Sequence, residues 1–240
     1  LGQLGYLDFA GASVVHSVGG WIALSVLLIV GNRTGRFRED DTKKSFQGSN
    51  TPIAALGALI LWFGWFGFNG GANGAMDLKI PLILINTFLS ASFGLILSSI
   101  MGILVLKKPE PLFMLKGPLA GLVSITASCA YVDPADAILI GSIGGIVSGS
   151  TIVLLEKVKI DDVVSAIPVH LACGMWGTIA VAIFGNFETM GVEKTRLEQL
   201  FIQLIGIGSI GSFCFFGSYI ILKTINSFFP LRVSKIQEEL

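Results

Sequence analysis

The chain contains two histidines, and the residues around them follow the same pattern twice. In DFAGASVVHSVGG, His16 stands eight residues after Asp8, and in DVVSAIPVHLACG, His170 stands eight residues after Asp162, with a glycine four positions beyond each histidine. Two neutral imidazoles that meet in an apolar interior can hydrogen-bond and then accept or pass a proton, whereas burial disfavours a second positive charge. A role in helix packing is the alternative, but two histidines in matched surroundings favour a proton-handling site.

The two aspartates have a second interpretation. Each begins an apolar run, where a carboxylate can accept hydrogen bonds from the free backbone amides of a helix start. We interpret Asp162 as a cap, whereas Asp8 can be either a cap or a residue of the site.

Composition indicates a membrane protein. Of the 240 residues, 52% are hydrophobic and 13% charged, and the mean hydropathy is +0.78, far above that of an ordinary soluble domain. The net charge of zero gives no sign of a nucleic-acid partner. The sequence has no nucleophile-and-base set, metal cluster or disulfide spacing, so we expect no enzyme, cofactor or metal site. The chain begins at Leu1 without a charged leader, and we expect its natural start to lie upstream.

Seven apolar runs are long enough, or nearly so, to cross a hydrocarbon core of about 30 Å, which takes about 20 helical residues. They predict an all-α, polytopic transmembrane helix bundle over residues 1–228, followed by a tail over residues 229–240. One run, Gly117–Tyr131, is short for a span and is expected to be tilted or broken. Glycines at four-residue spacing, Gly141, Gly145 and Gly149, predict close helix crossings. The seven runs are Phe9–Val30, Thr51–Asn69, Ile80–Leu106, Gly117–Tyr131, Ala135–Leu155, Val163–Gly185 and Gln199–Leu222.

The positive charges fall on one side of the predicted bundle. If each run crosses the membrane once, thirteen lysine and arginine residues lie in the segments on one side and three on the other. The positive-inside rule then places the N-terminus outside and the tail in the cytoplasm of a multi-pass protein of the cell membrane. The larger group is Arg33, Arg36, Arg38, Lys43, Lys44, Lys107, Lys108, Lys116, Lys157, Lys159, Lys223, Arg232 and Lys235, and the smaller is Lys79, Lys194 and Arg196.

The two histidine motifs begin on opposite faces of this bundle. The first descends from the outer side and the second rises from the inner side, so each histidine lies about 12 Å deep at 1.5 Å per helical residue. Two antiparallel helices with matched motifs are typical of an inverted-topology repeat, in which the transport site lies at the midplane between the halves. We therefore expect the rings of His16 and His170 to meet in the middle of the bilayer.

Four stretches resemble signatures of the ammonium transporter family. DFAGASVVHSVGG resembles its fifth helix, WFGWFGFNGGANGA its sixth, DDVVSAIPVHLACGMWGTIAVAIFG its tenth, and FPLRVS the start of its cytoplasmic tail. The resemblance covers nearly the whole chain. It implies part of a fold of eleven helices built on an inverted repeat and assembled as a homotrimer with one pore in each subunit, to which this chain contributes helices five to eleven.

By this resemblance, His16 and His170 are the twin histidines that line the pore. Phe68 is one of two phenylalanines that close the outer mouth, Trp65 lies beside it, and Asp8 lies near the outer site that recruits ammonium. Trp65 and Phe68 are three residues apart and share a helix face, where each ring can attract a cation by about 0.5 to 2 kcal/mol. The implied substrate is ammonium, which gives up its proton near the gate so that ammonia crosses past the histidines.

The resemblance also concerns three flanking positions. Thr126 and Asn69 are expected next to the pore, Asn69 at the point where glycines open the end of the sixth helix. Where the family usually has a serine that contacts the recruited cation, this chain has Ala72, which leaves one oxygen acceptor fewer. The helices that carry the second gate phenylalanine lie outside this chain.

Alternatives to a transporter are a receptor on the same scaffold and a conduit for another small neutral molecule. A receptor would bind ammonium and signal through a cytoplasmic domain fused after Leu240, whereas a transporter would end in a short tail that can bind a regulatory protein. Two other motifs do not indicate a function. GIGSIG at 206–211 fits a dinucleotide fingerprint but lies inside an apolar run, where no such site is expected. The glycosylation sequon at Asn32 falls in a loop predicted to lie on the inner side of the membrane, so we expect it to be unused.

Overall fold

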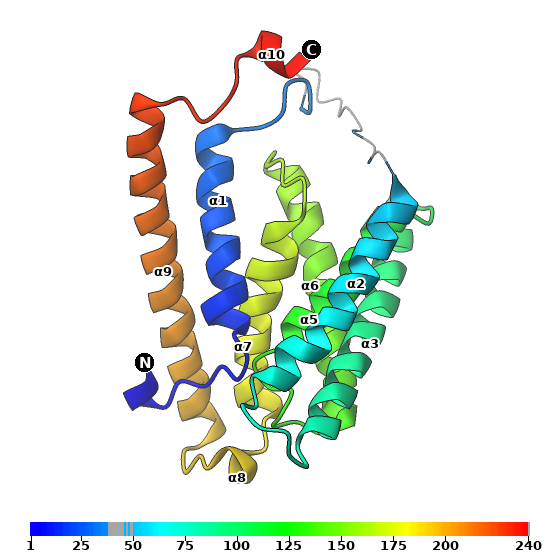
Figure 1. Ribbon diagram of the computed structural model, residues 1–240, viewed down its shortest axis with the longest axis vertical. Coiled ribbons are helices and arrows are strands. Elements are labelled where there is room, and N and C mark those ends of the chain that lie inside the picture. Colours follow the sequence, from blue (N-terminus) through cyan, green and yellow to red (C-terminus); the bar gives the residue numbers. More distant parts are fainter. Residues whose placement is uncertain (38–45, 47, 49, 240) are drawn as a thin grey trace.

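The computed structural model describes residues 1–37, 46, 48 and 50–239, and over these residues all regular structure is helical (Figure 1). This confirms the predicted all-α membrane bundle. Of the basic residues counted above, Arg38, Lys43 and Lys44 lie outside the described residues, as does Leu240. The helices are η1 Gly2–Leu4, η2 Ala12–Ser17, α1 Val18–Val30, α2 Thr51–Gly71, α3 Ile80–Leu106, α4 Pro111–Met114, α5 Lys116–Ile125, α6 Pro134–Lys157, η3 Ile167–Ala172, α7 Cys173–Phe184, α8 Phe187–Met190, α9 Arg196–Phe228 and α10 Lys235–Glu239.

Six helical segments are long and apolar enough to cross a membrane, and they coincide with six of the seven predicted runs. The seventh run is a broken helix: α5 has ten residues and gives way to turns over residues 126–131. The helix α9 starts three residues before its predicted apolar run because Thr195 and Glu198 form a capping box around its first turn. Helix α9 also extends past the apolar run, to Phe228.

Helices α3, α5 and α6 pack together through glycines. A Cβ atom on Gly141 would lie 2.1 Å from the carbonyl oxygen of Ser90, and one on Gly145 would lie 2.6 Å from that of Gly94. Backbones this close leave no room for a side chain, so α3 and α6 require glycine at these crossings. The predicted close packing is therefore present at the first two glycines of the four-residue series.

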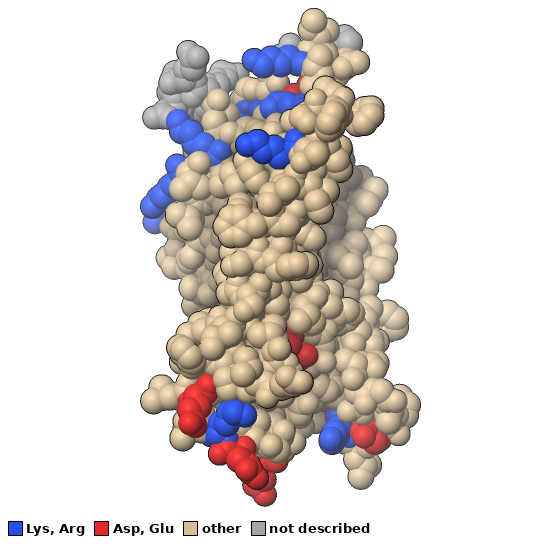
Figure 2. Space-filling model, turned by 90° about the vertical axis from the view of Figure 1, so that its left-hand side faces the viewer, with Lys and Arg blue, Asp and Glu red and all other residues tan. Residues whose placement is uncertain are grey.

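The two ends of the bundle differ in charge. Among the described residues, the segments after α1, α3 and α6 and the end of α9, which carry basic residues of the larger group, lie at the end that also holds α10, at the top of Figure 1, and we call this end the tail side. In the view of Figure 2, lysine and arginine gather at the tail side, whereas aspartate and glutamate gather at the opposite end beside a few basic residues. The asymmetry agrees with the distribution expected from the sequence.

Candidate functional site

The two histidines lie on two short π-helices that enter the bundle from opposite ends. His16 lies in η2, which continues into α1, and His170 lies in η3, which continues into α7. In Figure 1, α1 runs toward the tail side and α7 runs away from it. Single π-helical turns are rare in proteins, and those that occur are often found at functional sites. The spacing of apolar residues in the sequence did not distinguish these turns from α-helix.

Asp8 caps the first of these helices with both carboxylate oxygens. Its Oδ1 accepts hydrogen bonds from the amides of Gly11 (3.2 Å) and Ala12 (2.7 Å), and its Oδ2 accepts from those of Ser13 (2.8 Å) and Val14 (3.0 Å). Asp8 therefore acts as a cap, one of the two roles that the sequence left open for it. A carboxylate engaged by four amides fixes the start of η2, and hence the position of His16 about one turn further on.

Asp162 caps the second helix in the same manner with fewer bonds. Its carboxylate accepts from the amides of Ala166 (3.1 Å) and Ile167 (2.7 Å), as the sequence predicted for this residue. The two aspartates therefore hold equivalent places in the two motifs. Each one orients the helix that carries a histidine, and the two histidines lie in the centre of the bundle.

The glycine that follows each histidine lies against the backbone of the other motif. A Cβ atom on Gly20 would lie 2.6 Å from the backbone nitrogen of Leu171, and one on Gly174 would lie 2.4 Å from the carbonyl oxygen of Ala12. The two helices therefore cross where neither has a side chain. This close crossing brings the two histidines together.

The imidazoles of His16 and His170 are in direct contact. Their Nδ1 atoms are 3.3 Å apart, and their ring centroids are 5.3 Å apart with an angle of 21° between the planes. One Nδ1 must carry the shared proton while the other accepts it, so the two rings are opposite tautomers when both are neutral. The other nitrogen of His16, Nε2, is buried and has no hydrogen-bond partner among the described residues.

Two aromatic side chains of α2 cover the ring of His16. The indole of Trp65 stacks on it with centroids 4.8 Å apart and planes at 13°, and the ring of Phe68 lies 5.4 Å away at 43°. The indole N–H of Trp65 donates to Oγ1 of Thr126 (3.1 Å), which fixes the orientation of the ring. The structure thus brings together five of the residues singled out in the sequence.

Asn69 and Ala72 lie at the end of α2. Asn69 is fully buried, and its side-chain amide donates to Oγ1 of Thr87 (2.9 Å), so one of its roles is to join α2 to α3. Ala72 is the exposed C-cap of α2, and its amide donates to the carbonyl of Phe68 (3.3 Å). Ala72 therefore stands one turn beyond the aromatic pair.

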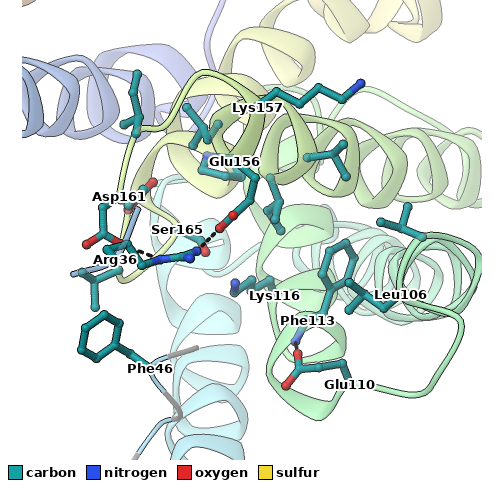
Figure 3. Close-up of a pocket in the computed structure, with 18 of the residues that line it drawn as sticks. Arg36, Phe46, Leu106, Glu110, Phe113, Lys116, Glu156, Lys157, Asp161 and Ser165 are labelled. Carbon is teal, nitrogen blue, oxygen red and sulfur yellow. Dashed lines mark hydrogen bonds and ion pairs between the residues drawn. The ribbon is translucent and has the colours of Figure 1, made fainter. Parts of the chain in front are cut away.

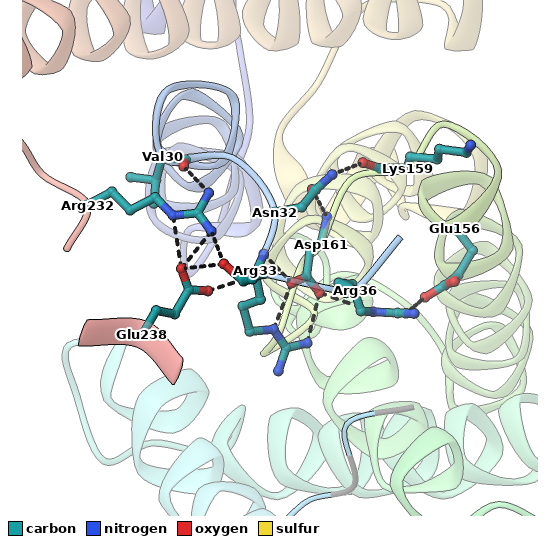
Figure 4. Close-up of polar contacts among 10 residues, drawn as sticks. Val30, Asn32, Arg33, Arg36, Glu156, Lys159, Asp161, Arg232 and Glu238 are labelled. Atoms are coloured by element: carbon teal, nitrogen blue, oxygen red, sulfur yellow. Dashed lines mark hydrogen bonds and ion pairs between the residues drawn. The ribbon is translucent and has the colours of Figure 1, made fainter. Parts of the chain in front are cut away.

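A network of ion pairs ties together the loops on the tail side (Figure 4). Arg33 pairs with Asp161 (2.7 Å) through two guanidinium nitrogens, and Arg36 pairs with both Asp161 and Glu156. Burial raises the pKa of Asp161, but the hydrogen bonds and charge of Arg33 outweigh it and hold the pKa below its usual value. The amide of Asn32 donates to the carbonyl of Lys159 (2.9 Å), so the asparagine of the sequon serves in this loop contact.

The tail joins the same network. The guanidinium of Arg232 pairs with Glu238 (2.7 Å) and donates to the carbonyl of Val30 (3.2 Å). Glu238 in turn accepts hydrogen bonds from the amide (2.7 Å) and the hydroxyl (3.0 Å) of Thr34. These contacts attach α10 to the loop that follows α1.

Two buried glutamines near the site were missed in the sequence. Gln199 and Gln203 are fully buried in α9, and Nε2 of Gln203 donates to the carbonyls of Leu7 (2.6 Å) and Thr178 (3.0 Å). They hold the extended segment that leads to Asp8. Their spacing of four residues on one face of an apolar helix was the available signal, because amides in a membrane must find partners inside the protein.

Residues 1–240 match the Ammonium Transporter Family over their whole length. A putative ammonium transporter of Synechocystis sp. is 40% identical over 245 residues, covering 100% of this chain and 44% of that protein. The ammonium transporter Amt2 of Archaeoglobus fulgidus is 37% identical over 250 residues, covering 100% of this chain and 53% of that protein. The chain thus spans about half the length of these relatives.

Solved structures share the arrangement of the helices. A sensor Amt protein superimposes with a TM-score of 0.96 at 38% sequence identity, and the match covers 99% of this chain and 59% of that chain. Saccharomyces cerevisiae Mep2 superimposes with a TM-score of 0.87 at 27% identity, covering 97% of this chain and 55% of that chain.

Proposed function

The chain belongs to the ammonium transporter family, and from this premise we propose that the whole protein moves ammonium across a membrane, with ammonia as the species that passes His16 and His170. One observation carries the proposal: the buried Nε2 of His16 has no partner among the described residues, and its ring contacts both Trp65 and His170. A polar atom left unpaired in an apolar interior costs free energy. A small molecule that hydrogen-bonds as it passes would remove that cost.

Recruitment of the cation is the first step. Ammonium loses hydration when it leaves water, and the faces of Trp65 and Phe68 offer cation–π attraction of about 0.5 to 2 kcal/mol each. Their ring centroids are 5.6 Å apart, so one small ion can contact both rings. Ala72, at the exposed end of the same helix, adds no oxygen acceptor, and binding at this outer site rests on the aromatic rings.

Loss of the proton is the second step. Carrying a charge to the centre of a bilayer costs at least about 2.5 to 3.5 kcal/mol, whereas neutral ammonia avoids most of this cost. Ammonia both donates and accepts hydrogen bonds, and Nε2 of His16 stands next to the aromatic pair to receive it. Deprotonation between the rings of α2 and His16 is therefore the arrangement that we propose.

The histidine pair provides a path for the proton. When one Nδ1 holds the bridging hydrogen, the ring that donates has a bare Nε2 and the ring that accepts has a protonated Nε2. A proton taken up by the bare Nε2 makes the donating ring an imidazolium, the bridging hydrogen then moves to the other ring, and that ring loses its own Nε2 proton. Both rings end neutral with their roles exchanged, and at no step do both carry a charge.

The orientation and assembly follow from the same premise. We propose that the tail side faces the cytoplasm, since it carries the excess of lysine and arginine, and that the protein is a homotrimer with a pore in each subunit. The helices that complete each pore belong to the part of the family fold that this chain does not span.

Transport by the full-length protein in liposomes tests the proposal. Uptake of ammonium and of methylammonium is measured together with electrical current on a supported membrane. We expect both substrates to be taken up, with a current that saturates as ammonium is raised. Binding of ammonium without any uptake would contradict transport.

Such a result would favour the second candidate, an ammonium sensor. The sensor Amt protein superimposes on 99% of this chain, so the same helices are compatible with signalling. A sensor would retain the recruitment site at Trp65 and Phe68 and would pass the signal through the tail. The length of the protein beyond Leu240 separates the two candidates, because a sensor needs an attached signalling domain.

A further inference from the structure

A cavity of about 600 Å³ opens on the tail side of the bundle (Figure 3). It lies between the end of α3, the start of α5, the end of α6 and the loop that leads into η3. Its lining includes Asp162, which caps η3, and Pro168, two residues before His170. The cavity therefore lies at the tail-side start of the helix that carries His170.

The described lining carries equal numbers of basic and acidic side chains. Each of the four carboxylates has a partner of its own. Asp161 and Glu156 pair with the arginines of the loop after α1, and Asp162 and Glu110 accept hydrogen bonds from backbone amides at the starts of η3 and α4. The charged lining residues are Arg33, Arg36, Lys116 and Lys157, with Glu110, Glu156, Asp161 and Asp162.

Lys116 differs from the other charged residues of the lining. It is the first residue of α5, its side chain is partly buried, and its ammonium group extends into the cavity in Figure 3. No hydrogen bond or ion pair joins it to another described residue. Burial lowers the pKa of Lys116, and the nearby carboxylates of Glu110, Asp162 and Glu156 offset part of this effect. Lys157, the other lysine of the lining, is exposed and its side chain points away from the cavity.

The side chain of Lys116 ends in a primary ammonium, which is chemically close to the ammonium ion itself. A free cation attracted by the three carboxylates would occupy the region that this tethered group already fills. Without Lys116, the described lining would have one negative charge more than positive charges. An apolar-walled cavity with such a surplus concentrates small cations.

We propose that Lys116 is a specificity-determining residue of the inner approach, whose tethered ammonium keeps free cations out of the cavity and leaves the path to His170 open to neutral ammonia. The inference rests on the proposed function, since it concerns the species that reaches the histidines. It goes beyond that function by assigning selectivity to a residue outside the histidine and aromatic groups.

A structural experiment tests the inference without transport. Crystals of the full-length protein are soaked in rubidium chloride, because Rb⁺ is close to ammonium in size and its anomalous scattering locates it. We expect no Rb⁺ in the inner cavity of the wild type or of Lys157→Met, and Rb⁺ near Glu110 and Asp162 in Lys116→Met. Rb⁺ in the wild-type cavity, or its absence from that of Lys116→Met, would overturn the proposal.

A second measurement uses current. With Rb⁺ or K⁺ on the tail side of liposomes, Lys116→Met should raise the alkali-ion current relative to the ammonium current by about tenfold. Lys116→Arg, which keeps the charge, and Lys157→Met should match the wild type. An unchanged ratio in Lys116→Met would refute the selectivity role while leaving ammonium transport standing. A wild type that moves no ammonium would refute the proposed function, and the rubidium soaks would still decide the role of Lys116.

Discussion

The Nδ1 atoms of His16 and His170 lie 3.3 Å apart although 154 residues separate the two histidines in the chain. Neither residue is placed by its immediate neighbours alone. An aspartate cap at the start of each motif and a glycine crossing just after each histidine fix both helices, and the rings meet as a consequence. The contact therefore depends on both halves of the repeat at once.

Replacing both histidines with leucine should abolish the proton path while preserving the fold. Leucine fills a similar space and leaves no polar atom unpaired, so the double variant should assemble as the wild type does. We expect the ammonium-dependent current to fall by on the order of tenfold or more, because a general acid–base group contributes at least that much. Current on a supported membrane and size-exclusion chromatography provide the measurements.

Two tryptophans follow the histidines, Trp21 by five residues and Trp176 by six. Trp176 supplies a control for the histidine variant. The indole of Trp176 donates to the carbonyl of Ile140 (3.0 Å), and its ring contact is with Phe184. Trp176→Phe should reduce stability without changing the ratio of current to uptake. A histidine double variant with the wild-type rate and charge movement would rule out the relay.

The sequence predicted the histidine pair because the motif occurs twice and the apolar runs give each copy a direction. It also predicted the cap by Asp162 and the glycine packing of α6. It did not predict the close approach of Gly20 and Gly174 to the opposite backbones, because spacing along one helix carries no information about its partner. The π-helical turns were missed because the spacing of apolar residues does not distinguish a π-helix from an α-helix.

Lys116 illustrates a second limit. In the sequence it is one of thirteen basic residues assigned to one side, and a count of charges says nothing about depth or neighbours. The structure places it, half-buried, in the lining of a cavity that also holds the carboxylates of Glu110, Glu156 and Asp162. A short apolar run preceded by a lysine was the visible signal.

Removing the carboxylate of Asp8 should destabilise the protein more than removing that of Asp162. Asp8 accepts four backbone hydrogen bonds and Asp162 accepts two. A hydrogen bond to a charged group contributes about 1.5 to 3 kcal/mol, although the bonds to one carboxylate do not add fully. We expect Asp8→Ala to lower the melting temperature by several degrees more than Asp162→Ala in detergent. Equal shifts, or a larger one for Asp162→Ala, would contradict the difference in capping.

Gly20→Ala should separate the two histidines, whereas Gly19→Ala should not. A methyl group on Gly20 would lie 2.6 Å from the backbone of Leu171, but nothing lies within 4 Å of one on Gly19. Forcing atoms into a packed crossing costs about 1 to 3 kcal/mol. Melting temperature and ammonium current should both fall for Gly20→Ala and stay near wild-type values for its neighbour. Equal behaviour of the two variants would show that the crossing is not tight.

Ala72→Ser should strengthen the binding of ammonium at the outer end of α2. The new hydroxyl adds an oxygen acceptor one turn beyond Phe68, and a hydrogen bond to a charged group is favourable. Because the position is exposed and water weakens the new hydrogen bond, we expect a gain of roughly threefold to tenfold in affinity. Titration of current against ammonium gives the apparent affinity, and Ala72→Val is the control of similar size. No difference between serine and valine would place the cation elsewhere.

The attachment of the tail through Glu238 should survive mild acid. Hydrogen bonds from the amide of Thr34 and from Arg232 lower the pKa of Glu238 from 4.5 to about 2. A depressed pKa stabilises the attached state fully above pH 4.5, and this contribution is lost as the pH falls toward 2. Spin labels at Leu28→Cys and Lys235→Cys, in a Cys214→Ala background, should therefore report one short distance at pH 7 and at pH 5.

Glu238→Gln removes the charge at every pH and should broaden that distance already at pH 7. Gln237→Ala changes a neighbour whose side chain accepts hydrogen bonds from Ser234, the residue before α10, and it serves as the matched control. A distance that broadens between pH 7 and pH 5 in the wild type would contradict the prediction, because both pH values lie above the range in which Glu238 is protonated. A variant that keeps the narrow distance at pH 7 would assign the attachment to Arg232 and Val30 instead.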